Sequence, residues 1–312
     1  MSRRLRETAR DLCSGLVSGV LLRCCPALVN VCYDSLPYAW LNFMVGHGFF
    51  GQPARAFSWH ITLANGKRLE LDVDPSNGFS TGYAFDYKRH DVGLRRVQEF
   101  LIDRMGPSSL YLDIGANVGV SSIYALSCGR NCWLFEPNTA LRPFVEKLFA
   151  ANGYTTARLE DVALSEVAGE AEFFVSRSSF LSSFDQAHAA FEGEVVRVQV
   201  PLRTLDSYLP ELTATAREIV VKIDVEGHEL AVLRGALETL KRYRPPVMIE
   251  LRSDTATRTA AFEFMAALGY ACHGIANAPR MTLKSLPSPA EAIAFCDINF
   301  LFVSKDSALP LR

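Results

Sequence analysis

The chain has 312 residues, which is enough for one large α/β domain with an N-terminal extension, or at most two domains. Its hydrophobic content of 49% and charged content of 21% are typical of a globular protein, and a formal net charge of −2 gives no electrostatic reason to expect nucleic-acid binding. The eight cysteines include no C-x-x-C pair, which argues against zinc and thioredoxin-type motifs and favours free thiols in a reducing cytoplasm.

Residues 1–56 are predicted to form a helical N-terminal extension. Arginines near the start precede an apolar stretch from Leu12 to Leu22, an arrangement similar to a signal peptide. Arg23 ends this stretch before the roughly 20 residues that a membrane-spanning helix needs, and no cleavage motif follows. We expect a retained amphipathic helix that packs on the folded domain or lies on a membrane surface. A cleaved signal peptide is the alternative.

Residues 57–312 are predicted to form one domain, with a hairpin at 57–73 and a core at 94–303. Asn65-Gly66 between two β-like runs is a strong hairpin signal. The strands expected in the core are 110–114, 132–135, 157–163, 219–225, 247–251, 270–273 and 299–303. The helices expected are 93–105, 118–127, 139–152, 229–243 and 258–268. This alternation, ending in a close pair of strands, predicts a doubly wound, Rossmann-like sheet that is mostly parallel with a reversed last strand.

An insertion interrupts the alternation between the third and fourth parallel strands. Its two β-like runs, 170–175 and 195–200, would lie beside the carboxyl edge of the sheet, where ligands bind in such folds. The connection from Arg177 to Phe184 is either a substrate lid or a solvated loop.

A nucleotide-type turn follows the strand at 110–114, in the motif Asp113-Ile114-Gly115-Ala116-Asn117-Val118-Gly119. Its glycines allow a tight turn just before a helix N-terminus. Asp113 replaces the first glycine of the dinucleotide fingerprint, and its carboxylate would repel a pyrophosphate. S-adenosylmethionine carries a positive charge and hydroxyl groups but no phosphate, so the motif favours a methyltransferase over a dehydrogenase.

A second acid, Glu136, ends the next strand at the spacing of about 20 residues that is typical of an acid binding ribose hydroxyls. Pro137 ends the strand and suits the first turn of the following helix. An acid in this place is common by itself, but together with the glycine turn it indicates a cofactor site.

The densest group of ionisable residues is Lys222-Ile223-Asp224-Val225-Glu226-Gly227-His228-Glu229. In an extended strand Lys222, Asp224 and Glu226 would share one face, so they either line a wet cleft or form a structural salt bridge. His228 has the chemistry of a general base, with a helix cap as the alternative. We expect these four residues to be catalytic. We predict no metal, although Glu250 with Asp224, Glu226 and His228 offers an alternative cation site.

Together the motifs resemble those of FkbM-type methyltransferases over about residues 57–303. The matching segments are 113–119, Phe135-Glu136-Pro137-Asn138, Val162-Ala163-Leu164-Ser165, Thr204-Leu205-Asp206 and 222–229. The resemblance implies S-adenosylmethionine as the cofactor and, often, O-methylation of sugars, polyketides or other natural products. The family commonly has a small residue where His228 stands, so the resemblance implies no role for His228.

The resemblance also implies which residues bind the cofactor: Asp113, Gly115, Asn117, Gly119, Glu136, Asn138, Asp161, Val162 and Ala163. The first four would surround the methionine end, Glu136 would hold the ribose hydroxyls, and the last three would flank the adenine. Asp224 and Glu226 would face the reaction cleft.

The predicted function is therefore S-adenosylmethionine-dependent methylation of a hydroxyl on a small molecule or glycan, with no nucleic-acid partner. A nucleotide-dependent oxidoreductase and a non-catalytic cofactor-binding scaffold are the alternatives. The expected location is the cytoplasm, with membrane association through the N-terminal helix as a variant.

Overall fold

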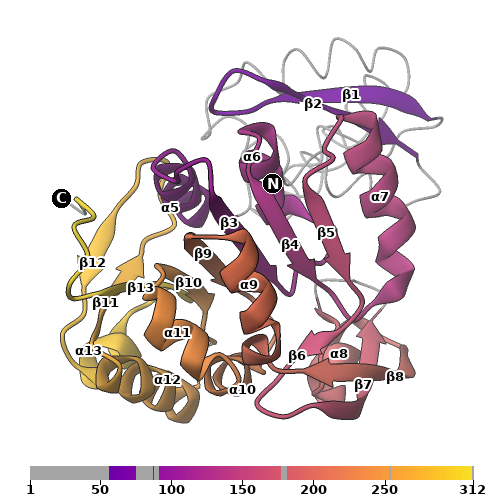
Figure 1. Cartoon of the computed structure of the whole chain (residues 1–312). Coiled ribbons are helices and arrows are strands. Elements are labelled where there is room, and N and C mark those ends of the chain that lie inside the picture. The colour runs from indigo at the N-terminus through magenta and orange to yellow at the C-terminus, as the bar shows by residue number, and fades with distance from the viewer. Residues whose placement is uncertain (1–55, 75–86, 88–90, 177–180, 253, 311–312) are drawn as a thin grey trace, which may run out of the picture. The chain divides into compact units, whose positions relative to one another are not determined.

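The computed structural model describes residues 56–74, 87, 91–176, 181–252 and 254–310 (Figure 1). By their internal contacts, the described residues up to Val92 belong with Lys147–Gly153 to one compact unit, and the other described residues belong to a second. The predicted N-terminal extension falls almost entirely outside the described residues. The first part of the predicted lid connection, Arg177–Phe180, also lies outside them. Among the described residues, no helix has the length and apolar content needed to cross a bilayer.

The first unit contains the predicted hairpin. Its strands are β1 (Phe57–Thr62) and β2 (Arg68–Val73), paired antiparallel. Gly66, at φ +79°, makes the turn in a left-handed conformation that suits glycine. Alternate residues such as Ile61 and Leu69 are buried, as the period of two in a strand requires. The hairpin prediction is confirmed.

The second unit is built on an eight-stranded sheet of order β12-β11-β13-β10-β9-β3-β4-β5. Its strands are β3 (Ser109–Ile114), β4 (Asn131–Phe135), β5 (Ala157–Glu160), β9 (Glu218–Ile223), β10 (Val247–Glu250), β11 (Tyr270–Ile275), β12 (Leu283–Ser285) and β13 (Asn299–Ser304). Strand β13 runs antiparallel to both of its neighbours, and β12 runs antiparallel to β11, while the other pairs are parallel. The predicted mostly parallel sheet with a reversed last strand is confirmed.

Helices pack on both faces of this sheet. One face carries the main core, in which Leu112, Val221 and Ile249 from adjacent strands join Leu233 and Phe262 from the helices gathered on one side in Figure 1. The helices and turns of this side are η5 (Leu205–Tyr208), α9 (Leu209–Thr215), α10 (Glu229–Arg234), α11 (Leu237–Tyr243), α12 (Thr255–Ala267) and α13 (Pro289–Ala294). The elements before and between the first strands are α5 (Val92–Ile102), η1 (Val120–Ser122), α6 (Ile123–Ser127), η2 (Thr139–Leu141) and α7 (Arg142–Ala151).

The order of the strands creates a switch point at β3. The chain runs from β3 outward through β4 to β5, and then returns to place β9 on the other side of β3. In open α/β sheets, ligands bind at the carboxyl ends of the strands beside such a reversal. The predicted neighbours, the Asp113 strand and the Lys222 strand, pair in register with Asp113 opposite Lys222.

The insertion forms a separate three-stranded sheet of order β6-β8-β7. It comprises β6 (Ala163–Leu164), β7 (Gly169–Ser176), α8 (Gln186–Ala189), η4 (Ala190–Glu192) and β8 (Val195–Arg203). The prediction of one strand over 157–163 was wrong, because β5 ends at Glu160 and Ala163 already belongs to the smaller sheet. Phe173 and Val200 give this sheet a core of its own.

The helix predicted over 229–243 is two helices, α10 and α11, with Gly235 between them. A Cβ on Gly235 would lie 1.9 Å from the carbonyl oxygen of Ser165, so the chain passes too close for a side chain there. Asp206, from one of the family motifs, caps the start of α11 by accepting hydrogen bonds from the backbone amides of Glu238 and Thr239 at 2.9 and 2.8 Å. The break is therefore stabilised by tertiary contacts.

Candidate active site

A left-handed turn links β3 to η1 and α6. Gly115 and Gly119 have φ values of +75° and +78°, and Asn117 between them has φ +50°. A Cβ on Gly115 would lie only 1.8 Å from the carbonyl oxygen of Asp224. Glycine is thus required here both by the backbone conformation and by the close approach of the turn that follows β9. We call Gly115–Gly119 the glycine turn.

Asp113 lies beneath the glycine turn and has no exposed surface. Its Oδ2 accepts a hydrogen bond from the Ser122 hydroxyl at 2.7 Å, and its Oδ1 lies 3.6 Å from the Lys222 ammonium. Burial raises the pKa of Asp113, and Lys222 opposes this. In this structure Asp113 supports the turn from below and presents no surface to a ligand, in contrast to the expected position around the methionine end.

Lys222 connects the two strand ends. Burial acts to lower its pKa, but the carboxylates of Asp224 and Asp113 outweigh burial and raise it, so the ammonium stays charged. Its Nζ lies 3.1 Å from Asp224 Oδ2 and also donates to the carbonyl oxygen of Gly115 at 3.3 Å. The lysine thereby holds the glycine turn and Asp224 together.

Glu136 bridges the ends of β3 and β4. Its two carboxylate oxygens accept hydrogen bonds from the backbone amides of Asn117 and Asn138, at 2.8 and 2.9 Å. Burial raises the pKa of Glu136 to about 7, while these two amides act to lower it. The carboxylate is thus oriented by the backbone, with lone pairs left for a ligand.

A pocket opens beside Glu136 and contains about 280 Å³ of space continuous with solvent. The lining residues are Ala116, Asn117, Leu134, Glu136, Asn138, Leu141, Arg142, Val145, Leu159, Glu160 and Asp161. The Oδ1 atom of Asn117 is buried and has no hydrogen-bond partner within the described part of the chain. A buried acceptor in this state suits a ligand that donates a hydrogen bond.

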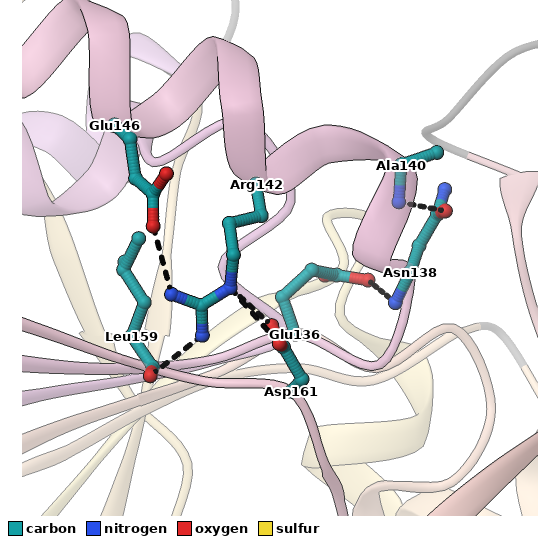
Figure 2. A network of polar contacts seen from close by, with 7 residues as sticks. All are labelled: Glu136, Asn138, Ala140, Arg142, Glu146, Leu159 and Asp161. Atoms are coloured by element: carbon teal, nitrogen blue, oxygen red, sulfur yellow. Dashed lines mark hydrogen bonds and ion pairs between the residues drawn. The ribbon is translucent and has the colours of Figure 1, made fainter.

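Arg142 and Asp161 also line the pocket, and they belong to the polar network drawn in Figure 2. The guanidinium of Arg142 donates to both oxygens of Asp161, at 2.8 and 2.9 Å, and to the Leu159 carbonyl at 2.9 Å. Val162 and Ala163, which were expected to flank adenine, bury their side chains in the main core and in the core of the insertion, respectively. Of these three residues, only Asp161 lines the pocket.

Three carboxylates gather where β9 and β10 end. Asp224, Glu226 and Glu250 place ligand oxygens within 4.8 Å of one another, and we call them the acidic cluster. Lys222 pairs with Asp224 and Arg252 pairs with Glu226, but the single charge of Lys222 is shared with Asp113. Such a cluster also has the composition of a cation site. His228, the fourth residue of the metal alternative, is not part of it in the described structure.

Glu226 reaches the cluster from beyond the strand. Strand β9 ends at Ile223, and Glu226 has a left-handed φ of +53°, so the expected extended run with Lys222, Asp224 and Glu226 on one face was wrong. The Glu226 carboxylate instead pairs with the Arg252 guanidinium at 2.7 Å and lies 3.3 Å from His188 Nε2. Burial and then the charge of Asp224 raise the pKa of Glu226 to about 7, against the effect of Arg252.

His228 points to the insertion. Its Nε2 lies 2.9 Å from the Ser165 hydroxyl, and its ring packs on the ring of Phe184 with the centroids 4.6 Å apart. Burial lowers the pKa of His228. It is the N-terminal cap residue of α10, although its side chain makes no capping hydrogen bond. The structure brings Lys222, Asp224 and Glu226 together but directs His228 elsewhere.

The sequence reasoning missed His188 and Arg252. His188 lies in the insertion, far from the motifs in sequence, and Arg252 follows the end of β10 without a recognisable pattern. A positively charged residue one or two positions beyond a strand end was the available signal for Arg252, and no local signal marked His188.

Comparison with known proteins assigns this sequence to a family. The family model for the methyltransferase FkbM domain matches residues 113–272, more than half of the chain. No curated protein matches.

Among solved structures, methyltransferase FkbM from Methylobacillus flagellatus has 15% identity and a TM-score of 0.42, covering 64% of this chain and 44% of that one. A SAM-dependent methyltransferase from Agrobacterium tumefaciens has 10% identity and a TM-score of 0.42, covering 79% and 70%. A tRNA (uracil-54, C5)-methyltransferase from Pyrococcus abyssi, in complex with S-adenosyl-L-homocysteine, has 15% identity and a TM-score of 0.37, covering 78% and 43%. The chain thus spans less than half of the length of two of these proteins. On the family match, the chain belongs to the FkbM methyltransferase family, and its cofactor is S-adenosylmethionine.

Proposed function

We propose that this protein methylates a hydroxyl oxygen on a neutral small molecule or glycan. The observation that carries the proposal is the acidic cluster beside the glycine turn, where the carbonyl oxygen of Asp224 approaches Gly115 closely. Carboxylates in this place can accept a hydrogen bond from a hydroxyl group and so orient it for methyl transfer.

The pocket residues fit the cofactor. The Glu136 carboxylate, oriented by two backbone amides, is the group we assign to the ribose hydroxyls. The unpartnered Oδ1 of Asn117, on the wall of the same pocket, is available to a donor such as an amino group. Asn138 and Asp161 complete the cofactor-binding set through their positions on the pocket wall.

The remaining residues would act on the acceptor. When bound, S-adenosylmethionine supplies an electrophilic methyl group, so alignment of the acceptor oxygen provides much of the rate enhancement. Asp224 is held by Lys222 and is about one-third exposed, which allows it to meet an acceptor from solvent. Glu226 is held by Arg252 in a similar way. We assign these two carboxylates to orienting the acceptor hydroxyl.

The charge of the site favours a neutral acceptor. Lys222 is buried and is already shared between Asp113 and Asp224, so it presents little positive charge to a ligand. A phosphate-rich chain would meet the acidic cluster directly, and like charges repel at this range. We therefore propose a polyhydroxyl compound and not RNA as the acceptor.

Two measurements test the proposal. Calorimetric titration should show micromolar binding of S-adenosylhomocysteine and no binding of NAD. The protein should then transfer a deuterated methyl group from S-adenosylmethionine to a panel of methyl glycosides, with the label located on oxygen by NMR, and not to a short RNA of matched concentration. Tight NAD binding without a response to S-adenosylhomocysteine would overturn the cofactor assignment. Transfer to RNA, or to nitrogen or carbon, would overturn the acceptor assignment.

A further inference from the structure

The insertion brings a second histidine to the acidic cluster. His188 lies on the short helix α8, which begins after Asp185, and the carboxylate of Asp185 caps it by accepting hydrogen bonds from the backbone amides of Ala187 and His188. Just before this helix, the Ser183 hydroxyl donates to the carbonyl oxygen of Glu226 at 2.8 Å. The segment that carries His188 is thus attached directly to the turn that carries Glu226.

His188, Glu226 and Arg252 form a connected set. His188 Nε2 lies 3.3 Å from Glu226 Oε2, and the same Glu226 oxygen lies 2.7 Å from the Arg252 guanidinium. His188 Nε2 is buried and, at this distance, has no well-aligned hydrogen bond to any residue in the described part of the chain. The side chains of His188 and Glu226 are 23% and 24% exposed, so an acceptor can reach the pair from solvent.

The backbone at Arg252 is held by Arg258. The buried guanidinium of Arg258 donates to the backbone carbonyl of Arg252 at 2.8 Å and to those of Leu251 and Phe295 at 3.1 and 2.7 Å. The end of β10 is thereby held in one conformation, and this fixes the starting point of the Arg252 side chain. Glu226 thus contacts both Arg252, whose backbone carbonyl is held by Arg258, and His188.

We propose that His188, oriented by Glu226, is the base that accepts the proton of the acceptor hydroxyl. The inference rests on the proposed O-methylation. We place the imidazole proton on Nε2, which lies 3.3 Å from Glu226 Oε2, so that the lone pair of Nδ1 receives the proton of the acceptor. The O–H bond breaks and its proton passes to His188. The acceptor oxygen forms the new C–O bond as the methyl–sulfur bond breaks, and the electron pair stays on sulfur.

The surroundings of His188 suit this task. Three charged groups face it: Asp185 from its own helix, Glu226 from the turn after β9, and Arg252 from the end of β10. Burial and then Arg252 lower the pKa of His188, against the effect of Asp185. A lowered pKa favours the neutral imidazole, which is the form that can act as a base. His228 has its Nε2 engaged by Ser165 and its ring covered by Phe184, which leaves it less suited to the role.

The first test needs no acceptor. Histidine titration by NMR is carried out on the full chain with S-adenosylhomocysteine present, for the wild type and for Glu226→Gln. We expect the pKa of His188 to fall in the variant, because the negative charge of an ionised Glu226 within 4 Å stabilises the imidazolium. The pKa of His273, in β11, serves as the internal control. An unchanged pKa of His188 would overturn the pairing and the proposal with it.

The second test follows turnover with the methyl glycosides named above. His188→Ala should lower turnover by about 10²- to 10⁴-fold with little change in the affinity for S-adenosylhomocysteine. Added imidazoles should restore activity, and the rescued rate should rise with the pKa of the imidazole. A structural role would give no such rescue. Full activity of His188→Ala, or rescue of His228→Ala instead, would overturn the proposal.

Failure of the proposed acceptor class and failure of the His188 assignment can be distinguished. If the wild type methylates none of the glycosides, the proposed acceptor class fails, and the NMR titration still decides whether His188 and Glu226 form a coupled pair. If the glycosides are methylated and neither the titration nor the rescue responds, O-methylation stands and the assignment of His188 fails.

Discussion

Replacement of Glu136 by alanine gives the sharpest prediction for the cofactor site. Two charge-assisted hydrogen bonds to ribose hydroxyls contribute roughly 1.5–3 kcal/mol each before water replaces them. Because the pocket is open to solvent, we expect a net loss of about 2–3 kcal/mol, which corresponds to a Kd for S-adenosylhomocysteine that is roughly 30- to 150-fold weaker. Isothermal titration calorimetry measures this directly.

The structure adds a second consequence of this change. Both Glu136 oxygens accept hydrogen bonds from backbone amides, those of Asn117 and Asn138, so alanine leaves these two N–H donors to be satisfied by water. We expect the free energy of unfolding to fall by about 1–2 kcal/mol, the lower part of the range for unpaired buried donors. In Glu136→Gln the side-chain NH₂ must face one of these amide donors, so this variant should also bind more weakly despite its matched shape.

Glu146→Gln is the matched control, since Glu146 of α7 is 56% exposed and its 3.0 Å ion pair with Arg142 is of the solvent-exposed kind that contributes little. It should bind S-adenosylhomocysteine like the wild type. If folded Glu136→Ala binds within about threefold of the wild type, the assignment of Glu136 to the ribose is refuted.

Four further outcomes are expected. Because burial raises the pKa of Glu136 to about 7 and the ribose needs the carboxylate, the affinity for S-adenosylhomocysteine should rise with pH up to about 7 and then level off. The contribution of Glu136 to the stability of the fold has the opposite dependence: it is present below the unfolded-state pKa and is lost as the pH rises toward 7. Binding that is independent of pH between 5.5 and 8.5 would contradict this. Gly115→Ala should abolish cofactor binding and destabilise the protein by more than Gly129→Ala. Both glycines have left-handed φ values, but only at Gly115 would an added Cβ clash with a backbone atom. Thermal unfolding of the two variants compares them, and equal losses of stability would show that the contact with Asp224 is unimportant. Asp224→Asn should lower turnover by about 10²- to 10⁴-fold and change cofactor affinity by less than about tenfold, and the reverse pattern would place Asp224 in the methionine pocket. A chelator should leave activity unchanged, and a loss restored by a divalent cation would establish the metal alternative.

Much of the fold followed from local patterns. The alternation of apolar strands with amphipathic helices predicted the sheet, and a short pair of strands at the end predicted the reversed β13. Breaks within elements were not predictable in this way. The division of 229–243 into α10 and α11 depends on the approach of the Ser165 carbonyl to Gly235, a contact between residues far apart in the sequence.

The same distinction between local pattern and tertiary contact applies to the candidate site. By itself, the sequence determined the glycine turn, Glu136 and the group from Lys222 to Glu226, because each sits at a strand end where residue type and spacing carry the signal. Only the tertiary structure decided that Asp113 is buried beneath the turn, that Glu226 pairs with Arg252, and that His188 comes to the acidic cluster. The physical reason is that side-chain direction at a strand end depends on one backbone torsion, here the positive φ of Glu226, and on partners supplied by distant segments.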